Sequence, residues 1–199
     1  MTFDVNQTVF PSPQHQHIWN IGRQILPLDI SLADIDDEQT REGCTQIYNW
    51  TQKYLETMYQ KPEQYAGGDP YALFRMLDSI AEDAVIAGGG LVFSCKLYDR
   101  LMKSFGAYMA DLPLLGFDVD DQLSGKILRN RDYPLLCLYF KRLYEAANRK
   151  KVNRLDYLVF NDFRVLAPKY KRSLDDLLRT LPDDMKKFAV ELHEYALKK

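Results

Sequence analysis

Residues 31–60, SLADIDDEQTREGCTQIYNWTQKYLETMYQ, contain a strong helical pattern. Apolar side chains recur every three or four residues, which is the spacing of one face of an α-helix. This stripe consists of Cys44, Ile47, Tyr48, Thr51, Tyr54, Leu55 and Met58. Ser31 and Asp34 have the spacing of a capping box, and the acids at 36–38 suit the positive end of a helix dipole. The pattern therefore predicts a long amphipathic helix that begins after Ser31.

Trp50 falls beside this stripe, about 100° from its centre by the 3.6-residue repeat. We predict that it lies on the flank of the helix. Two roles fit this position: a partly exposed interface anchor, because tryptophan is frequent in binding hot spots, or a side chain covered by a neighbouring helix.

Similar periodicity recurs along almost the whole chain, and no run alternates convincingly as a β-strand does. We therefore predict an all-α fold: a single-domain bundle of seven to eight amphipathic helices over residues 1–199. Gly88-Gly89-Gly90 is interpreted as a corner between two antiparallel helices. Residues 113–125 mix proline, glycine and aspartate, and are the best candidate for a hinge.

Composition places the chain among intracellular globular proteins. Of the 199 residues 46% are hydrophobic, which is close to the globular norm. No apolar run reaches the roughly 18–20 residues of a membrane span, and the first residues do not resemble a secretory signal. The three cysteines, Cys44, Cys95 and Cys137, are far apart and odd in number, which favours reduced thiols. We expect a cytoplasmic protein without a membrane partner.

The two ends of the chain carry opposite charge. Residues 1–124, the acidic N-terminal subregion, hold 8 Lys+Arg and 18 Asp+Glu; residues 125–199, the basic C-terminal subregion, hold 18 and 10. Such a division either binds the two subregions to each other or presents a basic surface to an acidic partner. The sequence leaves both explanations open.

Two basic clusters are the candidate partner-binding residues. The first consists of Arg149, Lys150, Lys151 and Arg154, and the second of Lys169, Tyr170, Lys171 and Arg172. The leading hypothesis is an interaction or regulatory module that binds an acidic protein through these residues. An alternative is RNA or DNA binding by the same cations, with Tyr170 available for stacking. A purely structural explanation is that cations gather at the negative ends of helices.

Asp118-Val119-Asp120-Asp121 is the densest group of carboxylates. Clustered carboxylates can hold Mg²⁺ or Ca²⁺, so a helical enzyme with a carboxylate or metal site is a further alternative. The string lacks the spacing of a calcium loop, and acids that open a short helix explain it as well.

The remaining polar residues predict no specific chemistry. Cys95 has no histidine that can be assigned to it as a base, and the three histidines lack the spacing of known metal motifs. We therefore predict no catalytic, metal or cofactor site, which favours a role other than catalysis. An exposed aromatic stripe on one of the helices would allow a homo-oligomer.

Overall fold

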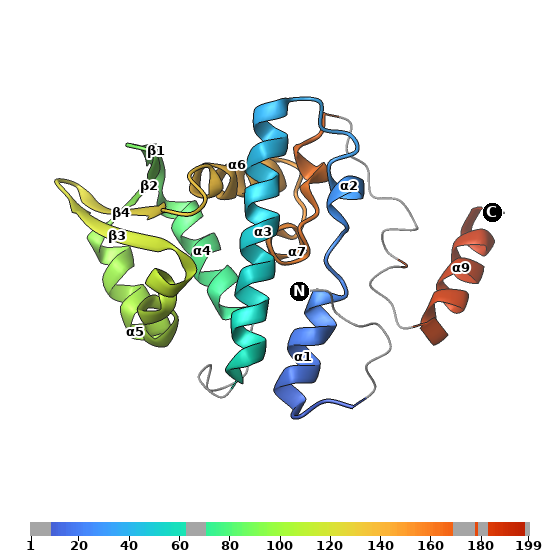
Figure 1. The fold of residues 1–199 in the computed structure, drawn as a ribbon. Coiled ribbons are helices and arrows are strands. Elements are labelled where there is room, and N and C mark those ends of the chain that lie inside the picture. Colours follow the sequence, from blue (N-terminus) through green and yellow to red (C-terminus); the bar gives the residue numbers. More distant parts are fainter. Residues whose placement is uncertain (1–8, 63–70, 169–177, 179–182, 198–199) are drawn as a thin grey trace. The chain divides into compact units, whose positions relative to one another are not determined.

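The computed structural model describes residues 9–62, 71–168, 178 and 183–197. The chain divides into two units, residues 1–168 and residues 169–199, and each is described by itself. The described residues form eight α-helices and one four-stranded antiparallel sheet (Figure 1). The all-α prediction was therefore wrong, because it did not include the sheet.

The elements of the first unit follow one another as seven α-helices, four strands and two 3₁₀ helices. They are α1 (Pro13–Gly22), α2 (Leu28–Ser31), α3 (Glu38–Gln60), α4 (Ala72–Asp83), β1 (Val85–Ala87), β2 (Gly90–Phe93), α5 (Cys95–Asp111), η2 (Leu112–Leu115), β3 (Phe117–Gln122), β4 (Gly125–Asn130), α6 (Leu136–Arg149), α7 (Arg154–Phe160) and η3 (Phe163–Leu166). The second unit contains α9 (Asp183–Leu197). None of the described helices is long and apolar enough to cross a membrane.

The sheet has the strand order β1-β2-β4-β3. Strands β1 and β2 form a hairpin whose two-residue turn is Gly88-Gly89. Both glycines have positive φ, 56° and 74°, which a two-residue turn matching the twist of the strands requires. The glycine run is thus the tip of a hairpin, and its interpretation as a corner between helices is corrected.

A second hairpin occupies the segment for which we predicted a hinge. Residues 117–122 and 125–130 pair as β3 and β4, and only residues 123 and 124 lie in the turn. The carboxylates of Asp118, Asp120 and Asp121 therefore stand on a strand rather than at the start of a helix. The change of charge along the sequence coincides with this turn, so acids on β3 face cations on and just after β4. Three ion pairs cross the hairpin: Asp118–Arg131 (2.5 Å), Asp120–Arg129 (3.0 Å) and Asp121–Lys126 (2.6 Å).

Helix α3 begins at Glu38, later than the capping-box spacing suggested. Asp37 is its N-cap and accepts a hydrogen bond from Thr40 N–H (2.7 Å). Ser31 is fully buried at the end of α2 instead, where its hydroxyl donates to the Asn161 carbonyl and accepts from Phe163 N–H (2.8 Å). The spacing of Ser31 and Asp34 thus resembled a helix cap, whereas the Ser31 hydroxyl binds backbone about 130 residues further along the chain.

The core of the first unit is centred on Trp50, which is fully buried. Its ring stacks on Tyr54 and meets Phe74, Phe117 and Phe140 edge-on, with centroids 5.5 to 6.0 Å apart. These rings come from α3, α4, β3 and α6, so Trp50 joins helices to the sheet. It lies at the centre of the core, so of the two roles considered for this position the side chain covered by neighbouring elements is confirmed, and the exposed interface anchor was wrong.

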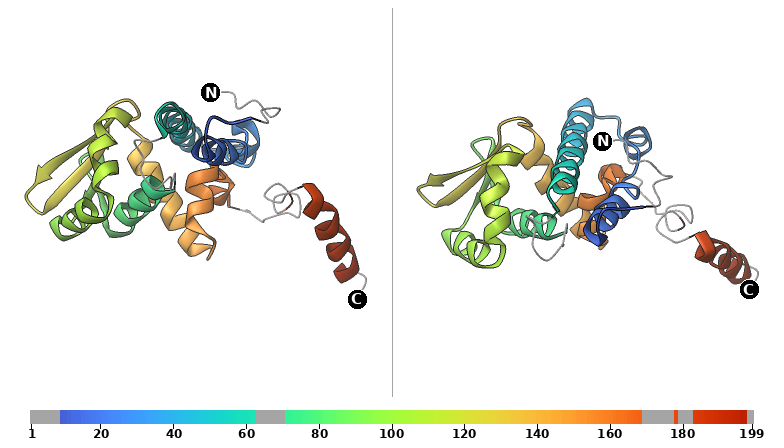
Figure 2. Two further views of the ribbon diagram at one scale, coloured as in Figure 1. Left: turned by 90° about the horizontal axis from the view of Figure 1, so that it is seen from below. Right: turned by 60° about the horizontal axis from the view of Figure 1, so that its bottom comes forward.

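The sheet and α5 lie at one end of the first unit and α1 and α7 at the other, with α4 and α6 between them (Figures 1 and 2). Helix α6 contacts α3, α4, α7 and the sheet, which explains the wide apolar surface of its sequence. Its C-terminal end carries three residues of the first predicted basic cluster, while the fourth, Arg154, begins α7.

Gly43 permits the close approach of α3 and α6, because a Cβ at this position would overlap the ring of Tyr139. Gly43→Ala should therefore lower the free energy of unfolding by about 2 kcal/mol through overpacking, although alanine is the better helix former. Urea unfolding measures this difference. Gly106→Ala in α5 is the matched control, since its Cβ would meet no atom within 4 Å, and it should stabilise by up to about 1 kcal/mol. Equal effects of the two substitutions would contradict the close approach.

Candidate interaction site at the end of helix α6

The structure places Arg149, Lys150 and Lys151 together where α6 ends. Arg149 is the last helical residue, Lys150 is the C-cap, and Lys151 follows with a left-handed φ of 54°. Lys151 N–H donates to the Asn148 carbonyl (3.2 Å) and Val152 N–H donates to the Ala147 carbonyl (3.1 Å). These two bonds are those of a Schellman motif, which satisfies the last carbonyls of the helix.

The three side chains of this α6 cluster have different surroundings, although all three residues are exposed. Lys150 Nζ donates to the Ala167 carbonyl (2.7 Å), so its ammonium is held against the backbone. Burial, and then the positive charge of Arg149, lower the pKa of Lys150. Neither Arg149 nor Lys151 forms a side-chain ion pair with another described residue.

Arg154, the fourth residue of the predicted cluster, belongs to an internal network. Its Nη2 lies 3.2 Å from Asp78 Oδ2, and its guanidinium lies 4.8 Å from the centre of the Tyr144 ring. The Asp78 side chain is only 12% exposed, and its Oδ1 has no hydrogen bond within the described part of the chain. Burial raises the pKa of the Asp78 carboxyl; the charge of Arg154 lowers it and that of Glu82, one turn later on α4, raises it.

The second predicted cluster lies outside the described residues, as do all four of its members, Lys169, Tyr170, Lys171 and Arg172. The structure therefore brings together three of the eight predicted residues on one turn and shows a fourth in an internal ion pair. Whether these residues bind a partner stays a prediction.

The carboxylates considered for a metal site are each paired with a cation across the β3–β4 hairpin. Within residues 9–62, 71–168 and 183–197, no group of three or more His, Cys, Asp or Glu side chains is arranged to hold a metal ion. The arginine and lysine partners would compete with a metal ion for these carboxylates.

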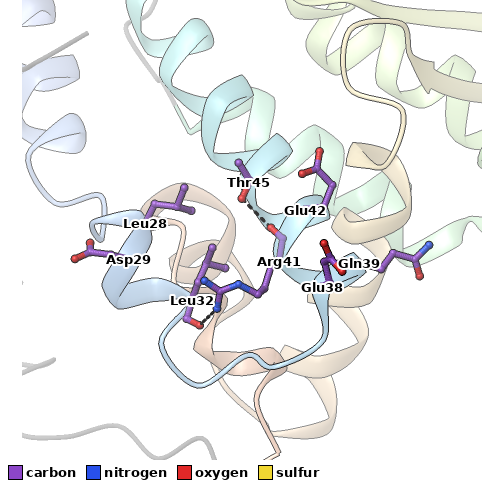
Figure 3. A pocket seen from close by; sticks show the side chains of 8 residues that line it. All are labelled: Leu28, Asp29, Leu32, Glu38, Gln39, Arg41, Glu42 and Thr45. Carbon is purple, nitrogen blue, oxygen red and sulfur yellow. Dashed lines mark hydrogen bonds between the residues drawn. The ribbon is translucent and has the colours of Figure 1, made fainter.

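An acidic hollow that was not predicted lies between α2 and the start of α3, shown in Figure 3. Leu28 and Leu32 form its apolar wall, while Asp29, Glu38 and Glu42 supply carboxylates. Arg41 also lines the hollow; its Nη1 donates to the carbonyls of Leu32 (2.9 Å) and Ile35 (3.0 Å). In the sequence, the acids at 36–38 were related only to the helix dipole. Asp29 lies too far from them along the chain for a local pattern to include it.

Two further hollows border α5. One is mainly apolar and lies between α5 and β3, where Tyr98, Met102 and Phe117 are among its lining residues. The other runs along the outer face of α5 past the cations Lys96, Arg100 and Lys103, with Asp99 between them. Cations on the polar face of a helix are usually solvated. The α5 cations therefore provide a control surface for the α6 cluster.

Comparisons with known proteins provide no relative. No protein-family model matches the chain. No curated protein and no solved structure matches it either.

Proposed function

We propose that this protein is an interaction module that binds an acidic protein partner through the α6 cluster, Arg149, Lys150 and Lys151. The proposal excludes Arg154 from the binding surface, because that guanidinium already has a carboxylate partner in Asp78. The observation that carries the proposal is the backbone conformation of Lys151.

Lys151 occupies a position that favours glycine. A left-handed residue after a helix C-cap is usually glycine, since a side chain there costs about 1 kcal/mol. The chain has a lysine at this position, with φ of 54°. Strain of this kind is often kept where a side chain is needed for function, and here the side chain is an exposed cation. A role in binding accounts for the lysine, whereas folding alone favours glycine.

The electrostatics of the α6 cluster point to an anionic partner. Arg149 adds to the effect of burial in lowering the pKa of Lys150, which means that the positive charges repel one another. The one nearby acid on α6, Glu145, lies 3.9 Å from Lys141. An acidic partner would relieve this repulsion and would raise the pKa of Lys150 towards its ordinary value.

An acidic protein fits better than single-stranded nucleic acid. Proteins that bind single strands combine cations with exposed aromatic rings on which bases stack. The described aromatic residues nearest to the cluster in the sequence are Tyr144 and Tyr157, which are 9% and 0% exposed. These two rings therefore offer no stacking surface.

Charge reversal tests the proposal with poly-glutamate as the acidic probe. We expect the wild-type protein to bind poly-glutamate at low salt, and Arg149→Glu/Lys151→Glu to lose at least tenfold in affinity without a lower melting temperature. Lys96→Glu/Lys103→Glu on α5 is the matched control, because it changes the net charge equally on another surface. Equal loss in both variants would show that only net charge matters. Tighter, more salt-dependent binding of a single-stranded RNA would favour the nucleic-acid alternative instead.

Lys151→Gly should raise the stability of the protein and weaken its binding to poly-glutamate. Glycine relieves the left-handed strain, so we expect about 1 kcal/mol more stability in urea unfolding. The same change removes one of three cations, so the affinity for poly-glutamate should fall severalfold. A variant that is more stable and binds poly-glutamate as well as wild type would contradict the role of Lys151.

A further inference from the structure

Helix α9 carries an unusual concentration of exposed apolar side chains. Met185, Phe188, Leu192 and Tyr195 are 50%, 66%, 57% and 59% exposed. They are four of the ten large hydrophobic residues that are exposed in the described part of the chain, yet α9 is only 15 residues long. Single exposed hydrophobic residues need no explanation, whereas a contiguous stripe of them marks an interaction surface.

The spacing of the stripe is that of a helix pair. The four residues follow one another at intervals of three, four and three, the a and d positions of two heptads. A helix of this length is marginal in water by itself, so it gains stability from a partner that covers its apolar stripe.

We propose that α9 pairs in parallel with α9 of a second copy of this chain. A two-fold axis between the helices places each a and d residue beside its own counterpart, so one stripe completes the other. No separate complementary groove is required. The proposal is independent of the α6 cluster, which lies in the other unit.

The residues beside the stripe favour the parallel arrangement. Ala189 and Ala196 occupy the e positions, and Glu191 occupies a g position. In a parallel pair each g residue faces an e residue of the other helix, so Glu191 faces the alanine edge. In an antiparallel pair the g edges face each other, and the two Glu191 carboxylates would meet and repel. The alanines also leave room for close approach of the two backbones.

Two heptads extend over only about 22 Å, so the association should be reversible. Sedimentation equilibrium of the full chain between about 5 and 500 μM should show a monomer that shifts towards a dimer as concentration rises. Phe188→Glu/Leu192→Glu should remain monomeric throughout. A wild-type protein that is monomeric at every concentration, or a double variant that dimerises as the wild type does, would overturn the proposal.

Lys187→Glu is the matched control for this experiment. It changes the net charge by the same amount as the double variant, but it lies outside the a, d, e and g positions, about 120° from the centre of the stripe. We expect its dimerisation to equal that of the wild type. If Lys187→Glu also abolishes the dimer, net charge rather than the apolar stripe governs association, and the proposal fails.

Disulfide cross-linking tests the orientation. Tyr195→Cys, made in a Cys95→Ser background to remove the exposed native thiol, brings two thiols together in a parallel pair and keeps them apart in an antiparallel one. Cys44 and Cys137 are buried and do not interfere. We expect an oxidised dimer that forms readily at high concentration. A reversible dimer that does not cross-link would overturn the parallel arrangement.

Discussion

Arg154→Met should lower the free energy of unfolding by about 3 kcal/mol at neutral pH, because it leaves a buried carboxylate without its counter-charge. The Asp78 side chain is 12% exposed, and its Oδ2 is 3.2 Å from Arg154 Nη2. Methionine preserves most of the apolar length of arginine, so the loss reports on charge rather than on packing. Urea unfolding at pH 7 provides the measurement.

Arg149→Met is the matched control. Arg149 is exposed and forms no ion pair with another described residue, so we expect a change within about 0.5 kcal/mol. The two arginines belong to one basic cluster in the sequence, but their structural roles differ. Equal stabilities of the two variants would contradict the assignment of Arg154 to an internal ion pair.

The loss in Arg154→Met should depend on pH. Burial raises the pKa of Asp78 above its ordinary value of 3.8, so this carboxyl contributes most to stability when protonated, and the contribution is lost as pH rises through the folded pKa. Arg154 opposes that loss because it stabilises the ionised form. The difference between variant and wild type should therefore be largest at neutral pH and should shrink as the pH falls through the raised folded pKa of Asp78. About 1 kcal/mol of the loss should remain at low pH, because the variant also lacks the cation–π contact between Arg154 and Tyr144.

Trp50→Ala should cost about 4 kcal/mol, the largest loss among the substitutions considered. The ring is fully buried against four aromatic neighbours, and its removal leaves a cavity between α3, α4, α6 and β3. Unfolding followed by circular dichroism measures the loss. A cost below about 2 kcal/mol would mean that the surrounding rings collapse into the space.

Trp50→Phe keeps an aromatic ring at this position but removes the indole N–H together with part of the ring volume. Trp50 Nε1 donates to the Leu115 carbonyl (3.2 Å), which also accepts from Asn130 Nδ2 (3.1 Å). The carbonyl therefore keeps a hydrogen bond when the indole is lost. We expect a cost well below that of Trp50→Ala, because Trp50→Phe keeps much of the ring packing and loses only part of the ring volume and one hydrogen bond.

The helices were largely predictable because their signals are local. The stripe from Cys44 to Met58 lies on α3 as expected, and most of its members are buried. The same local reasoning failed at Trp50. A helical wheel gives the angle of a residue on its own helix, but not how many neighbours surround that helix. Helix α3 packs against α1, α6 and η2, so residues beside the stripe are buried as well.

The sheet was missed for two physical reasons. Strand β1 has three residues and β2 has four, which is too short for alternation to be recognised. Strand β3 contains three aspartates, a residue that is depleted in strands. Its acids are tolerated because cations on and just after β4 compensate them, and this pairing becomes visible only when the hairpin is formed.

The helical stripes and the division into an acidic and a basic subregion could be predicted before the fold was known, because composition and 3.6-residue periodicity depend only on neighbouring residues. Which charges are neutralised depends instead on the folded chain. Four cations from residues 126–154 are paired with aspartates of residues 78–121, whereas Arg149 and Lys151 have no such pair among the described residues. Ion pairs between distant segments depend on how the chain folds back on itself, and a linear pattern does not contain that information.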